Sequence, residues 1–317
     1  MRGLQAEGGA LTWQPQSAVE LKSGEVRIRV QAAGLNRADL LQKAGMYPPP
    51  PGVTGVLGLE CAGEVIEVAE GSRWQLGDRV CALLAGGGMA EEVVVDQRHL
   101  LPVPESLSWA EAAAIPEVFS TAWLNIFVLG DARPGEKVLI HAGASGVGTA
   151  AIQLCKAQGN PCWVSVGSQD KLDACVELGA EGGVLRQNGI AALTDFGPFN
   201  VALDPVGATY AADHLDLLAV DARWVLIGLM GGREATLDLA KVLAKRISLL
   251  GSTLRTRDAD FKATLLADME QRLIPLFNSG ELKPMVAKTF SFSDAEAAFE
   301  ELARDQVVGK VILLRED

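Results

Sequence analysis

Six apolar, β-branched runs alternate with helix-forming segments in the second half of the chain, and this alternation limits the possible folds more than any other feature. Such runs predict strands that are buried on both faces. Strands joined by helices of this length form right-handed crossovers and a parallel sheet, so we predict a doubly wound α/β domain. The expected strands are residues 137–142, 162–167, 182–186, 200–207, 223–232 and 247–254, and the expected helices are residues 148–159, 170–180, 190–195, 208–220 and 238–246.

The first hundred residues have a different pattern, in which short alternating runs are separated by Gly and Pro turns. Residues 25–34, 63–71 and 78–96 are typical of small antiparallel strands. Residues 47–52, with the sequence YPPPPG, must form an extended loop because each proline removes a backbone donor. The first part of the chain is therefore predicted to be mostly β.

Helical patterns flank Pro116 in residues 108–127, and a long amphipathic helix is expected in residues 255–280. Strand patterns then return in residues 285–292 and 309–317, with a short helix between them. We predict a β-rich domain into which the parallel-sheet domain is inserted. The expected bounds are residues 1–117 plus 260–317 for the first domain and residues 118–259 for the second.

Composition excludes some classes of partner. Forty acidic side chains against 28 basic ones give a net charge of -12, which would repel nucleic acid and anionic membranes. The five cysteines include no CxxC pair, which favours a reducing compartment over a disulfide framework or a compact zinc site. No signal peptide or membrane span is recognised, so we expect a cytoplasmic protein whose partner is a small molecule.

A glycine-rich turn, Gly143-x-x-Gly146-x-Gly148, stands between the first expected strand of the parallel sheet and its helix. Backbone donors at such a helix N-terminus can bind a pyrophosphate. The spacing differs from the usual dinucleotide motif, and a tight packing turn is the alternative. The strand-turn-helix context favours a dinucleotide.

The next expected strand ends in Gly167 and Ser168, and Lys171 follows one helical turn later. A carboxylate at this strand end would bind the ribose diol of NAD, whereas a small donor and a cation suit a 2′-phosphate. This pattern predicts NADPH as the cofactor. The nearby Asp170 counts against it unless that side chain turns away to cap the helix.

Together, several motifs resemble the zinc-independent quinone oxidoreductases of the medium-chain dehydrogenase/reductase superfamily, and most closely the branch of tumour-suppressor-inducible NADPH:quinone oxidoreductases, with zeta-crystallin more distant. This resemblance spans nearly the whole chain. It implies a GroES-like catalytic domain, an inserted Rossmann domain, NADPH in the cleft between them, and a homodimer. The motifs are GLNRADLLQKAGMYPPPPG (34–52), GLECAGEV (58–65), AAAIPEVFSTAW (112–123), HAGASGVGTAAIQL (141–154) and RWVLIGLMGG (223–232).

The resemblance also argues against catalytic zinc. Zinc-dependent relatives have a ligand Cys near the position of Asn36 and a His-Glu pair where this chain has Leu59 and Glu60. An amide and an isobutyl group cannot replace a thiolate and an imidazole as ligands. We therefore expect no bound metal, a buried and paired Glu60, and Cys61 as a small core residue.

The resemblance implies two residues near the reacting atoms. Tyr47 stands on the proline loop and matches a family tyrosine beside the nicotinamide, although it could instead fill a domain seam. Asn36 would bond the cofactor ribose or the substrate oxygen, or it is a turn residue after Gly34. Ser145, Gly146 and Val147 would approach the pyrophosphate. Positions implied at the nicotinamide end are Thr121, Gly228, Leu229, Met230, Gly231, Leu254 and Arg255.

Three kinds of residue keep alternative interpretations. Arg186 replaces a family tyrosine, and it would stack on adenine, pair with the 2′-phosphate or point into solvent. Arg255 is either a site residue or an ordinary surface cation, and Thr121 could merely bond its own helix backbone. His141 is expected to be a satisfied core histidine, whereas His99 and His214 show no partner pattern.

The leading hypothesis is an NADPH-dependent reductase that transfers hydride to a quinone without a metal. A 2-alkenal or enone reductase would use the same residues, and a non-catalytic NADPH-binding protein is a third possibility. We expect residues 247–254 to lie at the sheet edge and to pair with the same segment of a second copy in a homodimer.

Overall fold

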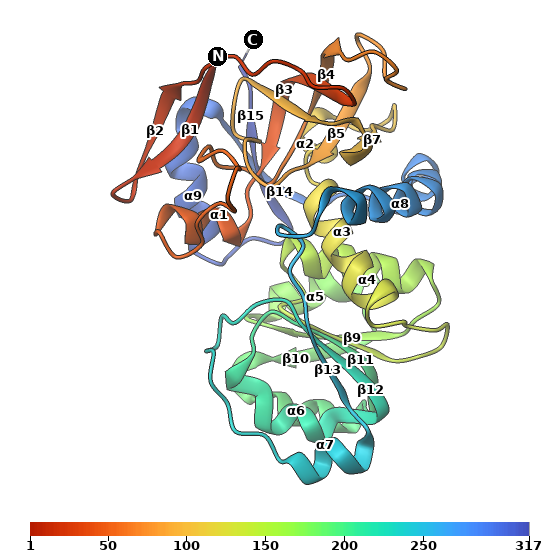
Figure 1. Ribbon diagram of the computed structural model, residues 1–317. Helices are drawn as coiled ribbons and strands as arrows, with labels where there is room; N and C mark the ends of the chain where they lie inside the picture. The colour runs from red at the N-terminus through yellow and green to blue at the C-terminus, as the bar shows by residue number, and fades with distance from the viewer. Residues whose placement is uncertain (317) are drawn as a thin grey trace. The chain divides into compact units, whose positions relative to one another are not determined.

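A computed structural model describes residues 1–316, and Asp317, the last residue of the final expected strand, lies outside them (Figure 1). The chain forms two compact units. Unit 1 consists of Met1–Ser120 and Leu254–Asp317, and unit 2 consists of Thr121–Thr253. The chain passes from unit 1 to unit 2 within helix α3, Pro116–Trp123.

Unit 2 is built on a six-stranded sheet with the order β10-β9-β8-β11-β12-β13, in which every pair is parallel. The doubly wound prediction is confirmed, and each expected strand is found. Because the order reverses at β8, the loops that follow β8 and β11 diverge to opposite sides at the carboxyl ends of the strands. The strands are β8 (Val138–His141), β9 (Cys162–Val166), β10 (Gly182–Leu185), β11 (Phe199–Asp204), β12 (Leu218–Leu226) and β13 (Ser248–Gly251).

Three helices of unit 2 begin at polar caps. The side chains of Ser145, Ser168 and Asp238 each accept a hydrogen bond from a backbone N–H of the first turn. The helical segments are the π-helical turn η2 (Leu124–Val128), α4 (Gly146–Ala157), α5 (Gln169–Leu178), the 3-10 turns η3 (Arg186–Asn188), η4 (Ile190–Asp195) and η5 (Ala208–Tyr210), α6 (Ala211–Leu217) and α7 (Leu239–Lys245).

One expected helix is shorter than predicted. The pattern in residues 208–220 predicts a continuous helix, but α6 ends at Leu217 and Leu218 already begins β12. Leu218 pairs with Phe199, and the register then shifts before Arg223 pairs with Val201. Leu217 and Leu218 are both buried, the first in the helix and the second in the strand. The continuous apolar run therefore spans two elements, and its helical periodicity predicted a helix that is too long.

Unit 1 contains a sheet of seven strands with the order β14-β15-β3-β4-β5-β7, and β6 also pairs with β3. The pairs among β3 to β7 are antiparallel, as predicted, whereas β14 and β15 are parallel. A separate hairpin joins the first two strands. The strands are β1 (Arg2–Glu7), β2 (Ala10–Pro15), β3 (Glu25–Gly34), β4 (Glu60–Val68), β5 (Arg79–Leu83), β6 (Glu92–Asp96), β7 (Leu100–Pro102), β14 (Val286–Ser291) and β15 (Lys310–Leu314).

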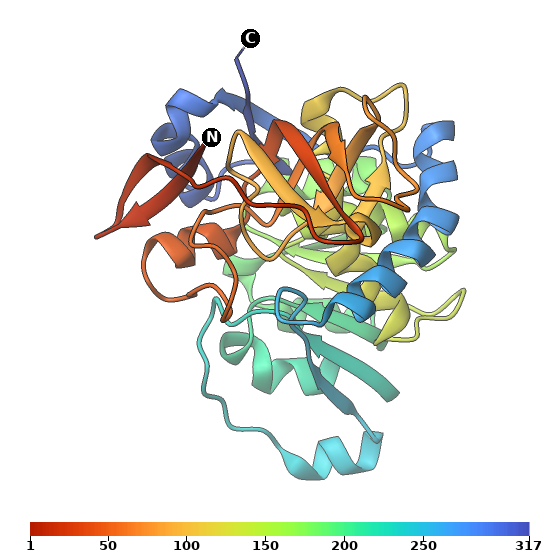
Figure 2. The same ribbon diagram turned by 45° about the horizontal axis from the view of Figure 1, so that its top comes forward.

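Helices and one long loop complete unit 1 (Figure 2). Pro116 begins α3, where its missing N–H removes no intrahelical bond. Residues 44–59 contain neither helix nor strand, which confirms the predicted proline loop. The remaining segments are α1 (Arg37–Lys43), η1 (Gln97–His99), α2 (Trp109–Ala112), α8 (Ala259–Ser279), η6 (Phe292–Asp294) and α9 (Ala295–Ala303).

Each unit has its own apolar core. In unit 1 the core includes Val26, Ile28 and Val30 on the inner face of β3, packed with Phe299 of α9. In unit 2 it includes Leu139, Phe199 and Trp224 from neighbouring strands. Within unit 2 this core supports β8 and β11, and within unit 1 the other core supports β3 and Leu35, which precedes Asn36.

Candidate functional site

The glycine turn of unit 2 connects β8 to α4 through a close backbone approach. Ala142 has a φ of +54°, in the left-handed region, and turns the chain at the strand end. A Cβ on Gly143 would lie 2.6 Å from Val164, and a Cβ on Gly148 would lie 2.4 Å from the carbonyl oxygen of Gly143. Two of the glycines are therefore required by packing, as the alternative interpretation of the motif states.

The same packing leaves an open helix N-terminus. Ser145 caps α4 by accepting a hydrogen bond from the Gly148 N–H at 3.0 Å. Its side chain is exposed, and Gly146 and Val147 are partly exposed. The first N–H groups of a 12-residue helix therefore face outward at the carboxyl edge of the parallel sheet, where they can bind an anion. The tight turn creates the anion cradle, so the two interpretations of the motif are compatible.

The end of β9 brings a glycine, a hydroxyl and a guanidinium together. A Cβ on Gly167 would lie 3.3 Å from Cζ of Arg186, so the arginine side chain lies against that glycine. Ser168 caps α5 and accepts a hydrogen bond from the Lys171 N–H at 3.4 Å. Ser168, not Asp170, is thus the cap, and Asp170 lies in the first turn of α5. The arrangement places positive charge beside this strand end.

Tyr210 lies close to this cluster, although no sequence motif pointed to it. Burial raises the pKa of its phenol, whereas a hydrogen bond with Ser165 and the charge of Arg186 lower the same pKa. Its ring lies 4.7 Å from the ring of His141. Tyr210 follows β11 by six residues, so only the strand order, which places β11 beside β8, could have revealed its position.

The histidines of unit 2 form a buried pair. His141 Nδ1 lies 2.8 Å from the Ser165 hydroxyl, and its Nε2 lies 3.2 Å from Nε2 of His214. His141 is therefore a satisfied core histidine, as predicted, and its partner is His214, for which the sequence shows no partner pattern. Burial lowers the pKa of His141 to about 4, with the Asp204 carboxylate opposing this shift. Burial also lowers the pKa of His214.

The loop from Gly228 to Gly231 packs against the turn that follows β11. The Thr209 hydroxyl donates a hydrogen bond to the Gly231 carbonyl at 2.6 Å, and a Cβ on Gly231 would lie 2.4 Å from that hydroxyl oxygen. Leu229 and Met230 expose about half of their surfaces at 54% and 49%. Thr121 is partly exposed on α3, and its carbonyl accepts a hydrogen bond from Asn125.

In unit 1, Arg255 holds the proline loop. Its guanidinium donates to the carbonyl of Ala85 at 2.7 Å, to the side chain of Gln42 at 2.7 Å and to the carbonyl of Tyr47 at 3.4 Å. The guanidinium carbon also lies 5.0 Å from the centre of the Tyr47 ring. Arg255 is 4% exposed, which excludes the alternative of a surface cation, and its neighbour Leu254 is also buried.

A buried ion pair stands beside Asn36. The Lys310 ammonium lies 2.7 Å from Oε1 of Glu60 and donates a hydrogen bond to Oδ1 of Asn36 at 2.6 Å. The Asn36 amide in turn donates to Oε1 of Glu60 at 3.0 Å. Glu60 is buried and paired, and Cys61 is buried in the core, both as predicted. No sequence motif pointed to Lys310. Its ammonium group places a positive charge beside the Glu60 carboxylate.

These contacts bear on the two expectations for Asn36. Both polar atoms of its side chain bond other side chains, and its backbone N–H donates to Asp39 at 2.8 Å. It is therefore a positioning residue within unit 1, and a bond to a ligand stays a prediction. Leu59, at the other position of a zinc ligand in relatives, is buried and apolar. The donor set around Glu60 does not suit Zn²⁺, because it combines an ammonium group with a single carboxylate.

Two further carboxyl groups lie near this ion pair. Burial raises the pKa of Asp39 to about 6, against the effect of the Asn36 and Gly58 N–H groups that it accepts. Burial, together with the charge of Glu60, raises the pKa of Glu117 to about 8. Burial also lowers the pKa of Lys262, whose ammonium donates to the Arg255 carbonyl at 2.9 Å. No motif predicted these groups, because they come from α1, α3 and α8.

The predicted residues thus fall into separate groups. In unit 2, Gly143, Ser145, Gly146, Val147 and Gly148 form one turn at the end of β8. Gly167, Ser168 and Arg186 meet at the end of β9, and residues 228–231 follow β12. In unit 1, Tyr47, Arg255, Leu254 and Asn36 come from the loop, the start of the second chain segment and the cap of α1.

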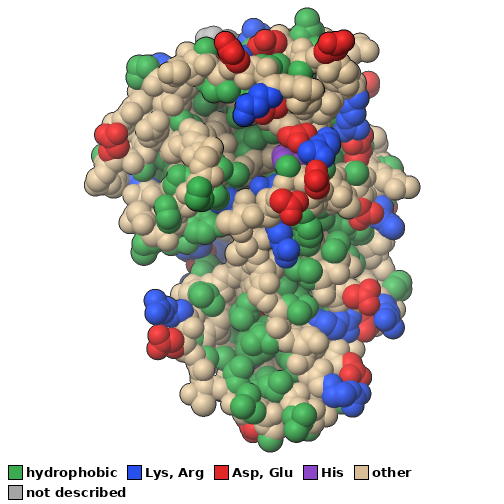
Figure 3. All heavy atoms as spheres, in the orientation of Figure 1, with side chains coloured by type: hydrophobic (Ala, Val, Ile, Leu, Met, Phe, Trp, Pro, Cys, Tyr) green, Lys and Arg blue, Asp and Glu red, His purple; other side chains and the backbone are tan. Residues whose placement is uncertain are grey.

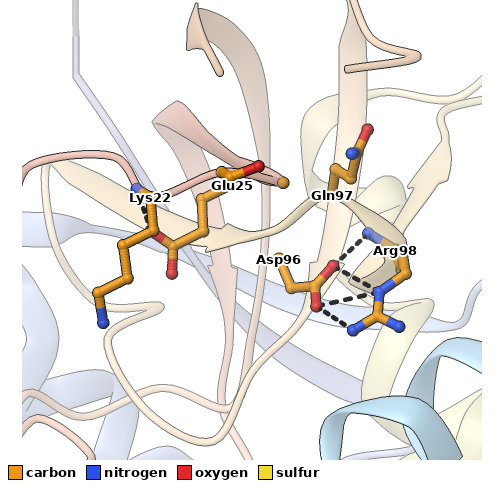
Figure 4. A pocket seen from close by; sticks show the side chains of 7 residues that line it. Lys22, Glu25, Asp96, Gln97 and Arg98 are labelled. Atoms are coloured by element: carbon orange, nitrogen blue, oxygen red, sulfur yellow. Dashed lines mark hydrogen bonds and ion pairs between the residues drawn. The ribbon is translucent and has the colours of Figure 1, made fainter. Parts of the chain in front are cut away.

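A surface pocket of about 310 Å³ lies elsewhere in unit 1 (Figure 4). Its lining includes Lys22, Glu25, Asp96 and Arg98, and none of the predicted site residues. Asp96 and Arg98 form an ion pair at 2.7 Å within this lining. Within residues 1–316, no helix is long and apolar enough to cross a membrane.

Two family models match the chain. The alcohol dehydrogenase GroES-like domain matches residues 22–105, and the zinc-binding dehydrogenase family matches residues 146–271. The fold and its glycine turn define an oxidoreductase of the type that uses a pyridine nucleotide. The chain belongs to the medium-chain dehydrogenase/reductase superfamily.

Individual relatives differ in their named activities. A solved quinone oxidoreductase from Thermus thermophilus is 33% identical, with a TM-score of 0.84 and coverage of 99% of this chain and 100% of that one. The JamJ enoyl reductase is 27% identical, with a TM-score of 0.87 and coverage of 99% of each chain. Polyketide synthase GfsB of Streptomyces halstedii is 31% identical over 305 residues, which are 96% of this chain but 5% of that protein.

Proposed function

We propose that this protein is an NADPH-dependent, metal-independent reductase of quinones, close to the tumour-suppressor-inducible branch of its superfamily. The observation that carries the cofactor choice is the cluster at the end of β9, where Arg186 lies against Gly167 beside the cap Ser168. A guanidinium there favours a 2′-phosphate, which a carboxylate would repel. The Thermus quinone oxidoreductase has been solved in complex with NADPH, which supports the same choice.

The residues of unit 2 fit the parts of such a cofactor. The N–H groups at the start of α4 would bind the pyrophosphate, with Gly143 and Gly148 keeping the turn close enough to the sheet. Arg186, Ser168 and Lys171 would bind the 2′-phosphate. Bound NADPH would supply a hydride for an electron-poor acceptor, and the protein would contribute position and electrostatics.

Tyr47 supports a flat aromatic acceptor in unit 1. Arg255 fixes the loop and stacks on one side of the Tyr47 ring. A rigid aromatic side chain can orient a quinone by stacking, so Tyr47 would position the acceptor. Asn36 would hold the nearby loop and helix in place through its bonds to Glu60 and Lys310.

Reduction of an enone or 2-alkenal is the second candidate. It is favoured by the likeness to the JamJ enoyl reductase and to a polyketide synthase. The same hydride donor and the same loop would serve, and only the shape of the acceptor pocket would differ. A protein that binds NADPH without turnover is the third possibility. The exposed N-terminus of α4 alone would be sufficient for such binding.

Oxidation of NADPH in the presence of a panel of acceptors tests these candidates. The panel comprises ortho-quinones, para-quinones, cyclic enones and 2-alkenals, each also measured with NADH. We expect quinones to give the highest kcat/KM with NADPH. Faster reduction of enones would select the second candidate, and tight NADPH binding without turnover of any acceptor would select the third.

A further inference from the structure

The side chain of Gln42, on α1, connects two parts of unit 1 that are distant in the sequence. Its Oε1 accepts a hydrogen bond from Nη2 of Arg255 at 2.7 Å, and its Nε2 donates to the carbonyl of Gly55 at 3.2 Å. An amide group can donate and accept at once, whereas a carboxylate can only accept. Gln42 uses both capacities, one toward each partner.

Arg255 is itself fixed by groups outside the proline loop. Its guanidinium donates to the Ala85 carbonyl at 2.7 Å, and its own carbonyl accepts a hydrogen bond from the Lys262 ammonium at 2.9 Å. From this fixed position it donates to the Tyr47 carbonyl at 3.4 Å and lies 5.0 Å from the centre of the Tyr47 ring. Arg255 therefore connects Gln42 to the start of the loop.

The proline loop is fastened to the rest of unit 1 at two points. Among the residues that the structure describes, hydrogen bonds join residues 47–55 to segments outside the loop at Tyr47 and at Gly55. The first bond comes from Arg255, and the second comes from Gln42. The four prolines between these points restrict the backbone. A stiff segment that is held at both ends leaves the Tyr47 ring little freedom to move.

We propose that Gln42 is a positioning residue for the acceptor, because it holds both ends of the loop that carries Tyr47 and thereby fixes the ring on which a flat acceptor stacks. This inference rests on the proposed function. Gln42 acts through Arg255 and Tyr47, and not on the reacting atoms. A loop that moves freely must be ordered when the acceptor binds, which costs affinity. Gln42 therefore governs the KM for quinones, whereas kcat depends on the cofactor and its chemistry.

Two substitutions of Gln42 separate its two bonds. Gln42→Met keeps the length of the side chain and removes both. Gln42→Glu keeps an acceptor for Arg255 but faces the Gly55 carbonyl with an oxygen, so it removes one. We expect the KM for a para-quinone to rise about 10-fold in Gln42→Met and about 3-fold in Gln42→Glu, the usual range for the loss of a hydrogen bond. In both variants kcat should stay within about 2-fold of the wild type.

Arg37→Met is the matched control, because Arg37 is exposed on the same helix and is also replaced by methionine. This variant should leave the KM and kcat for the para-quinone unchanged. Calorimetry should give the same NADPH affinity for all three variants, since the residues proposed to bind the phosphates of NADPH belong to unit 2. A change that is confined to the KM of the acceptor separates positioning from general damage to the fold.

The place of the Tyr47 ring can also be observed without turnover, because the chain contains two tyrosines, Tyr47 and Tyr210. In protein labelled with 3-fluorotyrosine, fluorine NMR should show one resonance for each, and Tyr210→Phe assigns them. We expect the Tyr47 resonance of Gln42→Met to move towards that of free 3-fluorotyrosine, as the ring leaves its place beside Arg255. The Tyr210 resonance should not move.

The two readouts decide between the possible outcomes. An unchanged Tyr47 resonance in both Gln42 variants would overturn this inference alone, and so would a lower kcat or a lower NADPH affinity with an unchanged KM for the quinone. If Gln42→Met does not fold, Gln42→Glu provides the same comparison with smaller expected changes. A wild type that binds NADPH but reduces no acceptor would overturn the proposed function and this inference together.

Discussion

The Lys310 ammonium lies 2.7 Å from a carboxylate oxygen of Glu60, and the two side chains are 4% and 0% exposed. A buried carboxylate that loses its only cationic partner keeps its desolvation cost without the attraction that offset it. We expect Lys310→Met to reduce the free energy of unfolding by roughly 3–5 kcal/mol, measured by urea denaturation. Glu60→Gln combined with Lys310→Met should recover much of this loss.

Lys288→Met is the matched control for this pair. Lys288 bonds Glu301 at 3.1 Å but is half exposed, so its removal should cost about 1 kcal/mol or less. Equal destabilisation by the two lysine substitutions would contradict the assignment of a strongly coupled buried pair.

Charge reversal at the end of β9 should change the cofactor preference. Arg186→Glu and Lys171→Glu would each place a carboxylate near the proposed 2′-phosphate, and we expect NADPH affinity to fall by about 10- to 100-fold, the effect of losing one charge-assisted bond. NADH affinity should change little. Calorimetry with both cofactors measures this, and Arg133→Glu, at an exposed arginine of the same unit, is the control. Equal losses for NADPH and NADH would show that the 2′-phosphate binds elsewhere.

Tyr47 should act through its ring more than through its hydroxyl. Tyr47→Phe keeps the stacking with Arg255, so kcat/KM for quinones should stay within about 3-fold of the wild type, equivalent to less than 1 kcal/mol. Tyr47→Ala removes the ring and should lower kcat/KM roughly 10-fold or more. Steady-state kinetics with one quinone distinguishes the two. An equally large loss in the phenylalanine and alanine variants would assign the chemistry to the hydroxyl.

The buried histidine pair predicts that stability falls in mild acid. Burial lowers the pKa of His141 from 6.5 to about 4, so between these values the unfolded chain binds more protons than the folded one. Stability therefore rises with pH in this window, and acidification from pH 7 to pH 4 should cost about 3 kcal/mol from His141 alone. Urea denaturation across this range measures the slope.

His214→Phe should flatten that slope, because the lowered pKa of His214 contributes in the same direction. Burial also lowers the pKa of His99 in unit 1, so His99→Gln measures the separate share of that residue in the slope. An identical slope in wild type and His214→Phe would exclude the pair as its source.

The edge of the parallel sheet predicts a homodimer. β13 pairs only with β12 among the described strands, and Leu249 is 45% exposed on it. Val220, Leu239 and Leu243 of unit 2 are also exposed, and green hydrophobic side chains gather in the lower part of the surface in Figure 3. An uncovered apolar edge favours pairing with an identical strand. We expect light scattering to give a dimer for the wild type.

Leu249→Lys should shift that equilibrium towards monomer, because two facing lysines would repel each other at a symmetric edge. Val176→Lys, at an exposed valine of α5, is the matched control and should leave the dimer intact. If light scattering shows that the wild type is a monomer, the proposed homodimer is wrong, whatever mass the variants give.

Sequence periodicity predicted the strands of unit 2 well because parallel strands are apolar on both faces and end at glycine or polar residues. It failed where one apolar run serves two elements, as at Leu217 and Leu218. The glycine turn was recognisable because its residues are contiguous. The same is true of Ser168, which caps the helix that immediately follows it.

Other site residues could not be predicted because their neighbours are distant in the sequence. Lys310 meets Glu60 only because β15 lies beside β3, which also pairs with β4. Nothing around Glu117 in the sequence indicates a raised pKa, since the causes are burial and the charges of Glu60 and Asp39, which come from β4 and α1. Arg255 in the motif RTRD resembles a surface cation until the proline loop folds over it.

The position of β15 also has a consequence for synthesis on the ribosome. β15 pairs with β14 on one side and with β3 on the other, and Lys310 bonds Leu35 and Asn36 near the end of β3. The emerging chain therefore completes every element of unit 2 before the last strand of unit 1 leaves the exit tunnel. Until then residues 32–34 of β3, beyond the part that β6 covers, have an uncovered edge, and Glu60 lacks its cation. Nascent chains stalled before residue 310 should therefore need chaperone protection that full-length chains do not.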